Sequence, residues 1–211
     1  MSAEPIASTH TLEALLARVQ RLEDTLEIQK VQAKYVHYLY TQRFDRIVED
    51  CFAQHLADVS VEFSDSGVYR GLASVRALYR AFEATKAIPG FFILHTMVNP
   101  YIEIAQDGRS ARSHWLSPGC AGSDKSASWI WGPFYVDYVK EEGAWRIAHS
   151  NFVPLFRNRY EASWAAAADH GSVRGPLAVE PDEPPTLYRP YNELKKERDI
   201  FSRHPSLPEA D

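Results

Sequence analysis

Apolar residues recur every three or four positions in the first part of the chain, a spacing typical of helices with one apolar face. The first series starts at Leu12 and meets neither Pro nor Gly. It predicts one long helix or two abutting helices over 12–42, with a single apolar stripe along the whole length. The same spacing predicts further helices over 44–52 and 71–86.

Later in the chain the apolar residues alternate with polar ones, which is the period of a β-strand. Asn99-Pro100 predicts a bulge or bend, residues 106–109 a hairpin turn, and residues 117–127 a Gly/Ser-rich loop. Helices followed by hairpin-linked strands predict an α+β fold in which helices cover one side of a curved sheet. The predicted strands are 59–63, 68–70, 91–105, 110–116, 128–140 and 144–153.

The C-terminal part has a different composition, because seven of the 13 prolines follow residue 169. We expect a loose N-terminus over 1–11, one domain over 12–168 that ends in a helix over 155–168, and a Pro-rich arm over 169–211. The apolar residues of the Pro-rich arm predict that the arm lies on its own domain or on a neighbouring subunit. We favour a homodimer or homotrimer in which the arm crosses to another subunit. These apolar residues are Leu187, Tyr188, Tyr191 and Leu194.

Charge and composition exclude several classes of protein. The net charge of −5 argues against a protein that neutralises nucleic-acid phosphates. No apolar run reaches the roughly 18 to 20 residues of a membrane helix, and no secretory signal is visible. The two cysteines form neither a disulfide framework nor a zinc pattern. We therefore expect a cytoplasmic protein that binds neither nucleic acid nor a membrane.

Candidate chemistry rests on histidines and aromatic rings, because no familiar nucleotide, metal or nucleophile motif is present. His95 lies on an apolar strand, where it serves either as a structural hydrogen-bonding group or as a general acid or base facing a cavity. Trp129, Trp131 and Tyr135 share one parity of a strand, so they line either a pocket for a flat ligand or the core.

Several short motifs together resemble those of the SnoaL-like group of the nuclear transport factor 2-like superfamily. The resemblance spans about residues 12–155 and implies a conical α+β barrel, in which a curved antiparallel sheet wraps around helices and encloses a deep pocket. The motifs are Lys34-Tyr35, Phe44-Asp45, Tyr69-Arg70-Gly71, His95-Thr96-Met97-Val98-Asn99-Pro100 and Gly143-Ala144-Trp145-Arg146-Ile147-Ala148-His149.

Enzymes of this group, such as polyketide cyclases, scytalone dehydratase and bile-acid 7α-dehydratase, carry out acid–base chemistry without a cofactor. The resemblance therefore implies no cofactor and no metal, and it assigns proton transfer to His95 with Tyr35 as the helix tyrosine. Tyr40 stands where some relatives have Asp, so a phenol replaces the carboxylate that would orient the histidine. His114 resembles a second histidine of scytalone dehydratase, and Asn99 falls within the His95 motif.

The sequence thus predicts a cofactor-independent lyase for a bulky aromatic molecule, phenolic or polyketide-like. Dehydration, retro-aldol cleavage, isomerisation and cyclisation use the same proton transfers and stay open. The alternatives are a non-catalytic ligand-binding or assembly protein, and the small subunit of a ring-hydroxylating dioxygenase. The expected catalytic residues are His95, Tyr35 and Tyr40, and the expected substrate-binding residues are His114, Asn99, Trp129, Trp131 and Tyr135.

Overall fold

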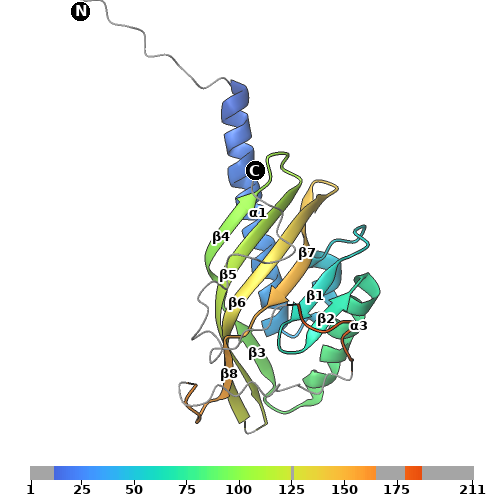
Figure 1. Cartoon of the computed structure of the whole chain (residues 1–211), viewed down its shortest axis with the longest axis vertical. Helices are drawn as coiled ribbons and strands as arrows, with labels where there is room; N and C mark the ends of the chain where they lie inside the picture. Colours follow the sequence, from blue (N-terminus) through green and yellow to red (C-terminus); the bar gives the residue numbers. More distant parts are fainter. Residues whose placement is uncertain (1–11, 125, 165–178, 187–211) are drawn as a thin grey trace, which may run out of the picture.

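A computed structural model describes residues 12–124, 126–164 and 179–186, and within them three α-helices and eight strands (Figure 1). The helices are α1 (Leu12–Tyr40), α2 (Phe44–Cys51) and α3 (Leu72–Glu83), and a short 3₁₀ helix, η1 (Ala84–Ala87), follows α3. The strands are β1 (Ser60–Phe63), β2 (Gly67–Arg70), β3 (Phe92–His95), β4 (Val98–Ile104), β5 (Ser110–Ser123), β6 (Ser126–Glu141), β7 (Ala144–Phe152) and β8 (Phe156–Arg159).

The strands form one sheet in the order β2-β1-β7-β6-β5-β3, with β4 paired to β5 and β8 paired to β6. The long strands β5 and β6 span the whole sheet, so that each has different neighbours along its two halves. All pairs are antiparallel except β1 and β7, which run parallel. The predicted α+β fold is confirmed; the sheet is mixed, because β1 and β7 are parallel where an antiparallel sheet was expected, and it is not closed.

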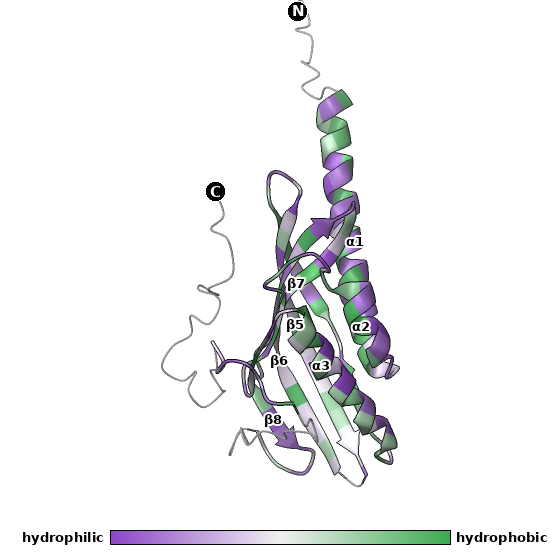
Figure 2. Ribbon diagram, turned by 90° about the vertical axis from the view of Figure 1, so that its right-hand side faces the viewer, coloured by the Kyte–Doolittle hydropathy of each residue, from purple (hydrophilic) through white to green (hydrophobic). Residues whose placement is uncertain are grey.

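The three helices lie on one side of the sheet, and the core fills the space between the two layers (Figure 2). Its largest side chains are aromatic, as the ring content of the sequence predicts. Tyr35 of α1 stands edge-on to Phe134 of β6, with ring centroids 6.4 Å apart, and Phe134 in turn packs at 4.6 Å against Phe152 of β7. Helix α1 is thereby fixed against the centre of the sheet.

Helix α1 carries two apolar stripes, not the single stripe predicted. Ile28, Val31, Tyr35 and Leu39 are buried against the domain, whereas the large apolar side chains from Leu12 to Leu26 are exposed. At about 100° per residue, the two sets point in roughly opposite directions around the helix axis. The sequence pattern has the correct spacing, but its phase changes near Asp24.

Asp24 marks the point where α1 meets the sheet. Its buried carboxylate accepts hydrogen bonds from Lys140 Nζ at 2.6 Å and from Trp145 Nε1 at 2.9 Å. Burial by itself would raise the pKa of Asp24, but these donors outweigh it and hold the pKa below its ordinary value. The N-terminal end of α1 extends beyond the sheet (Figure 1).

The expected loop over 117–127 is wrong, because most of these residues belong to β5 and β6. Its small residues permit close strand packing. A Cβ atom on Gly119 would lie 2.6 Å from the Leu94 carbonyl oxygen, and one on Gly122 would lie 2.4 Å from the Phe92 ring. Glycine here makes room for β3 and does not signal a turn.

The expected terminal helix over 155–168 is also wrong within the described residues, because Phe156–Arg159 forms β8. This strand pairs with residues 128–131 at the start of β6, whose backbone groups would otherwise form a free sheet edge. Sheet pairing therefore outweighs the helical spacing of this segment.

The described part of the C-terminal arm lies on its own domain, along β2 and α3. We call residues 179–186 the strap. Glu183 pairs with Val68 as an isolated bridge, and Arg70 binds Glu183 through two hydrogen bonds of 2.7 and 3.0 Å. Thr186 donates to Glu62 through its backbone nitrogen and its hydroxyl. The apolar residues Leu187, Tyr188, Tyr191 and Leu194 lie outside the described residues.

Within the same described ranges, none of the helices combines the length and the apolar character that a bilayer crossing requires.

Candidate functional site

A cavity of about 170 Å³ lies between the helices and the inner face of the sheet. Most of its wall is aromatic or aliphatic, and the polar groups are few and come from separate elements. Pockets of this kind suit small organic ligands, because apolar walls supply affinity and a few polar groups supply orientation. The side chains used below are Tyr35, Asp65, His95 and Arg157, together with Val179, Glu180 and Pro181 of the strap.

His95, at the end of β3, lines the cavity as predicted. Its Nδ1 shares a hydrogen bond of 2.9 Å with Ser117 Oγ of β5, and its ring stands edge-on to Phe134 and Phe152. The described part of the chain offers no hydrogen-bond partner to Nε2, which is thus the ring nitrogen left for a ligand. Burial and the nearby charge of Arg157 lower the pKa of His95 to about 3. The imidazole is therefore neutral near pH 7.

Tyr35 lines the cavity from α1, and its hydroxyl is fixed by a second tyrosine. The Tyr79 hydroxyl of α3 donates to the Tyr35 oxygen at 3.0 Å, so Tyr35 keeps its own proton for a third group. Burial raises the pKa of Tyr35 to about 12. The group is therefore a neutral hydrogen-bond donor.

An ion pair that the sequence did not reveal forms part of the cavity wall. Arg157 Nε of β8 lies 3.0 Å from Asp65 Oδ2 in the β1–β2 turn, and both side chains are mostly buried. Arg157 falls within the helix predicted over 155–168, whereas the structure places it on β8. The contact joins positions 92 residues apart, so no local pattern in the sequence could predict it.

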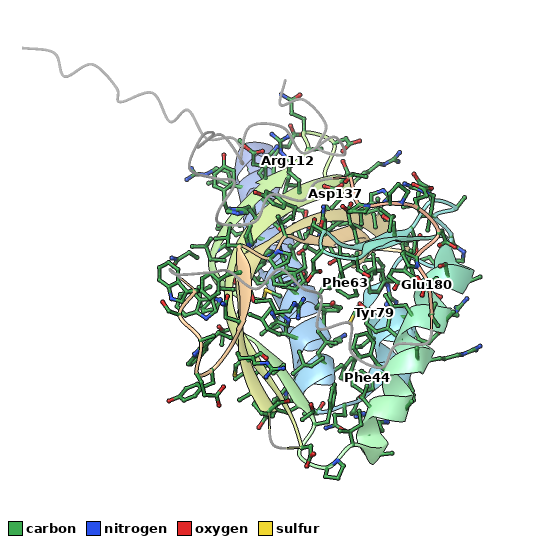
Figure 3. All side chains as sticks on the ribbon, turned by 60° about the horizontal axis from the view of Figure 1, so that its bottom comes forward. Phe44, Phe63, Tyr79, Arg112, Asp137 and Glu180 are labelled. Carbon is green, nitrogen blue, oxygen red and sulfur yellow. The ribbon has the colours of Figure 1, made fainter. Side chains whose placement is uncertain are left out.

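The strap closes the cavity on the side of β1 and β2. Val179, Glu180 and Pro181 contribute to the wall, and the Tyr69 hydroxyl donates to the Val179 carbonyl at 3.1 Å. Figure 3 labels Glu180 and Phe63, which reach the cavity from the strap and from β1. Gly67 lets the strap approach, since a Cβ atom there would lie 2.6 Å from both Pro181 and the Glu183 carbonyl.

Tyr40, expected as a catalytic group, does not line the cavity. It is the last residue of α1, and its side chain is 54% exposed. Five residues turn a helix by about 140° relative to Tyr35, whereas Leu39, four residues on, does reach the cavity. Helix geometry thus excludes Tyr40 from the wall that holds Tyr35.

The predicted substrate-binding rings lie on the opposite face of the sheet. His114 stacks on Tyr135 with centroids 5.0 Å apart, and Trp129 and Trp131 share this face because they alternate with Ile130. The two tryptophans pack on Tyr160 and Phe156. The side chains that line the cavity from β6 belong to the other parity: Ser128, Ile130 and Phe134. In Figure 3, Arg112 and Asp137 of the outer face lie away from Phe63.

Asn99 is also outside the cavity, because it is exposed on β4. Its φ of 49° lies in the left-handed region, which Asn tolerates better than most residues. The pairing of β4 with β5 shifts register between Val98 and Tyr101. The predicted bulge or bend is confirmed, and Asn99 lies within it.

Across residues 12–124, 126–164 and 179–186, no three His, Cys, Asp or Glu side chains gather as metal ligands do. The polar groups at the cavity include a neutral imidazole, a neutral phenol, an arginine paired with a carboxylate, and the side chain of Glu180. Such groups are suited to hydrogen bonding and proton transfer.

Solved structures with the same fold come from several bacteria. A protein of unknown function from Mycobacterium tuberculosis is 22% identical and has a TM-score of 0.53, covering 64% of this chain and 73% of that one. A candidate scytalone dehydratase from Novosphingobium aromaticivorans is 13% identical (TM-score 0.58, 69% and 93% covered). The hexachlorocyclohexane dehydrochlorinase LinA-type3 from Novosphingobium barchaimii is 13% identical (TM-score 0.57, 69% and 96% covered). At these identities the similarity establishes the fold alone.

No curated protein matches this chain in sequence. The family model of the SnoaL-like domain, however, matches residues 20–151, which include most of the helices and the sheet. The match contains Tyr35, Asp65 and His95 but ends before Arg157 and the strap. The chain therefore belongs to the SnoaL-like family, within the nuclear transport factor 2-like superfamily.

Proposed function

We propose that this protein is a cofactor-independent lyase that acts on a small aromatic molecule by proton transfer through His95. The observation that carries the proposal is the placement of the His95 ring, which has Nδ1 fixed by Ser117 and Nε2 left for a ligand in an aromatic cavity. The solved structures with the same fold include proteins described as a dehydratase and a dehydrochlorinase, and both names denote elimination reactions.

The cavity volume limits the substrate. An apolar cavity of about 150 Å³ is enough to hold benzene, and this cavity measures about 170 Å³. We therefore infer a substrate with one substituted ring inside the cavity, smaller than the polyketide-like molecule predicted from the sequence. The strap forms one part of the wall, so its displacement would make room for a larger substrate.

The reaction begins with the His95 tautomer that keeps its proton on Nδ1, hydrogen-bonded to Ser117, and has the lone pair on Nε2. In an aromatic β-hydroxy ketone, Nε2 takes a proton from the carbon between the two oxygen-bearing carbons. The C–H electrons form the enolate, which expels hydroxide from the neighbouring carbon and leaves the enone. The hydroxide takes the proton back from Nε2 of His95 and leaves as water, so the imidazole is neutral again. Tyr35 donates a hydrogen bond to the carbonyl oxygen, and Arg157 adds a positive charge near the developing enolate.

The low pKa of His95 fits this sequence of events, even though it makes the free imidazole a weak base. Proton transfer creates an imidazolium and an enolate together inside the cavity. The attraction between the negative enolate and the imidazolium offsets two free-energy costs, that of burying the imidazolium and that of its repulsion by Arg157. His95 is thus expected to accept a proton from a bound substrate much more readily than from water.

One probe tests the proposal and distinguishes two possible reactions, dehydration and retro-aldol cleavage. The β-hydroxy ketone 4-hydroxy-4-phenylbutan-2-one yields an enone and water by dehydration, but benzaldehyde and acetone by retro-aldol cleavage. Chromatography distinguishes the two sets of products. We expect turnover without added cofactor, and a loss of about 10²- to 10⁴-fold in kcat for His95→Gln, the usual contribution of general acid–base catalysis.

His114→Gln is the matched control, because His114 lies on the outer face of the sheet. Its rate should equal that of the wild type. If the probe binds to the wild type but neither set of products forms from it or from its ring-substituted analogues, the protein is a ligand-binding member of the family. Equal rates for His95→Gln and the wild type would exclude His95 as the proton-transfer group.

A further inference from the structure

The projecting part of α1 carries an apolar stripe that faces away from its own domain. The exposed fractions are large: 72% for Leu12, 66% for Leu22 and 55% for Leu26. Figure 2 shows this end of the helix extending past the other elements. We call the stripe the seam; it consists of Leu12, Leu15, Val19, Leu22 and Leu26.

The seam follows the spacing of a coiled coil. Its steps alternate between three and four residues, which places Leu12, Val19 and Leu26 at heptad position a and the two other leucines at position d. A surface helix of a globular domain has its apolar stripe against the core. Here the core-facing stripe of α1 is a different one, so the heptads belong to an interface between helices.

Isolated helices of about this length are marginally stable in water. Among the described residues, the hydrogen bonds that join α1 to the sheet begin at Asp24, so the sheet itself stabilises the preceding part of the helix little. Packing of the seam against another helix would supply that support.

The charges beside the seam are self-complementary, which identifies the partner. Arg18 occupies position g and Glu23 position e of the next heptad, and neither has an ion-pair partner in the described part of the chain. In a parallel pair of identical helices, position g of one helix faces position e of the following heptad in the other. Two symmetric Arg18–Glu23 pairs would therefore flank the seam, whereas an antiparallel pair would form neither.

We propose that the seam is a docking surface for a second copy of this chain, and that the two α1 helices form a parallel two-stranded coiled coil over residues 12–26. The composition agrees with two strands, because Val19 at an a position between leucines at d favours dimers. Since the seam and the core-facing stripe lie on opposite sides of α1, the two domains sit on the outer sides of the pair without a clash.

Sedimentation equilibrium of the full chain across a wide concentration range tests the interface. The wild type should dimerise, and the double variant Leu15→Glu/Leu22→Glu should have a dissociation constant at least about tenfold higher, because it places four like charges in the seam. Ala17→Glu, which adds charge at position f, is the control and should dimerise as the wild type does. All these positions are exposed, and an unchanged melting curve of the dilute monomer would verify the fold.

The orientation is tested separately by disulfide formation. In a Cys120→Ser background, Leu22→Cys should cross-link two copies under mild oxidation, since equal d positions meet only in a parallel pair in register. Ala17→Cys should not. Arg18→Glu should weaken the dimer, and Arg18→Glu combined with Glu23→Arg should restore it.

A chain that stays monomeric at every concentration overturns the proposal, and so does a dimer that the seam substitutions leave unchanged. Failure of Leu22→Cys to cross-link, or equal cross-linking through Ala17→Cys, overturns the parallel arrangement.

Discussion

Replacement of His95 by Gln should make the stability of the protein less sensitive to acid. The pKa of His95 is about 3 in the folded chain, because the ring is buried and Arg157 is near, and an ordinary histidine has a pKa near 6.5. Between these two values the unfolded chain binds a proton at this site and the folded chain does not. The unfolding free energy therefore falls as the pH drops below 6.5, and Gln, which does not titrate, abolishes this contribution.

The size of the effect follows from the two pKa values. Each pH unit between them corresponds to about 1.4 kcal/mol, so the site costs the wild type about 2 kcal/mol on going from pH 7.5 to pH 5. For a domain of this size that difference corresponds to about 4 to 8 °C in Tm. Above pH 6.5 the His95 contribution is constant, and below pH 3 no more is lost.

Urea denaturation of both proteins at pH 7.5 and pH 5 measures the prediction. The quantity of interest is the unfolding free energy of the wild type minus that of His95→Gln, which should fall by about 2 kcal/mol at the lower pH. Other titrating groups cancel, since both proteins share them. Ala33→Gln, at an exposed position of α1, removes and adds no titrating group; it is the control and should give the same difference at both pH values. A His95→Gln difference that does not change with pH would refute the reasoning and leave His95 as an ordinary accessible base.

Three further outcomes are expected. Asp24→Ala should lower the unfolding free energy by about 3 kcal/mol, as it leaves Lys140 and Trp145 without their buried acceptor; a loss below about 1 kcal/mol in urea denaturation would contradict this. Arg70→Ala removes two hydrogen bonds that hold residues 179–186. It should raise about tenfold the ratio of kcat/KM for a naphthyl analogue of the probe to kcat/KM for the phenyl compound. An equal ratio in the variant and the wild type would show that the strap does not limit substrate size. Turnover of the probe should persist in EDTA, and a loss that one metal ion restores would contradict the proposed chemistry.

The sequence predicted the groups that belong to local patterns. Tyr35 lies on a regular helix, and His95 lies within a motif on a strand, so both could be placed before the structure was known. Trp129 and Trp131 were placed on the wrong face, because alternation separates two faces without saying which one meets the helices. The pairing of Arg157 with Asp65 depends on strand β8, and β8 forms only because β6 offers a free edge.

Helix α1 is a second case in which the sequence pattern predicted the element but not the face that meets the domain. The spacing of its apolar residues is regular, and for that reason it predicts a helix correctly. The change of face near Asp24 is a shift of phase, which a search for periodic spacing treats as continuity. Only the contacts of Lys140 and Trp145 with Asp24 define where the domain ends and where the projecting segment begins.

The strap also has a consequence for the order of folding. Its contacts close very long loops, with 110 residues between Tyr69 and Val179 and 124 between Glu62 and Thr186. Closing such loops costs entropy that only an already formed docking surface can offset, whereas hairpins such as β5–β6 form locally. The sheet and helices therefore assemble first, and the cavity acquires its last wall afterwards. A folding molecule is then expected to pass through a state in which His95 is in place but still open to water.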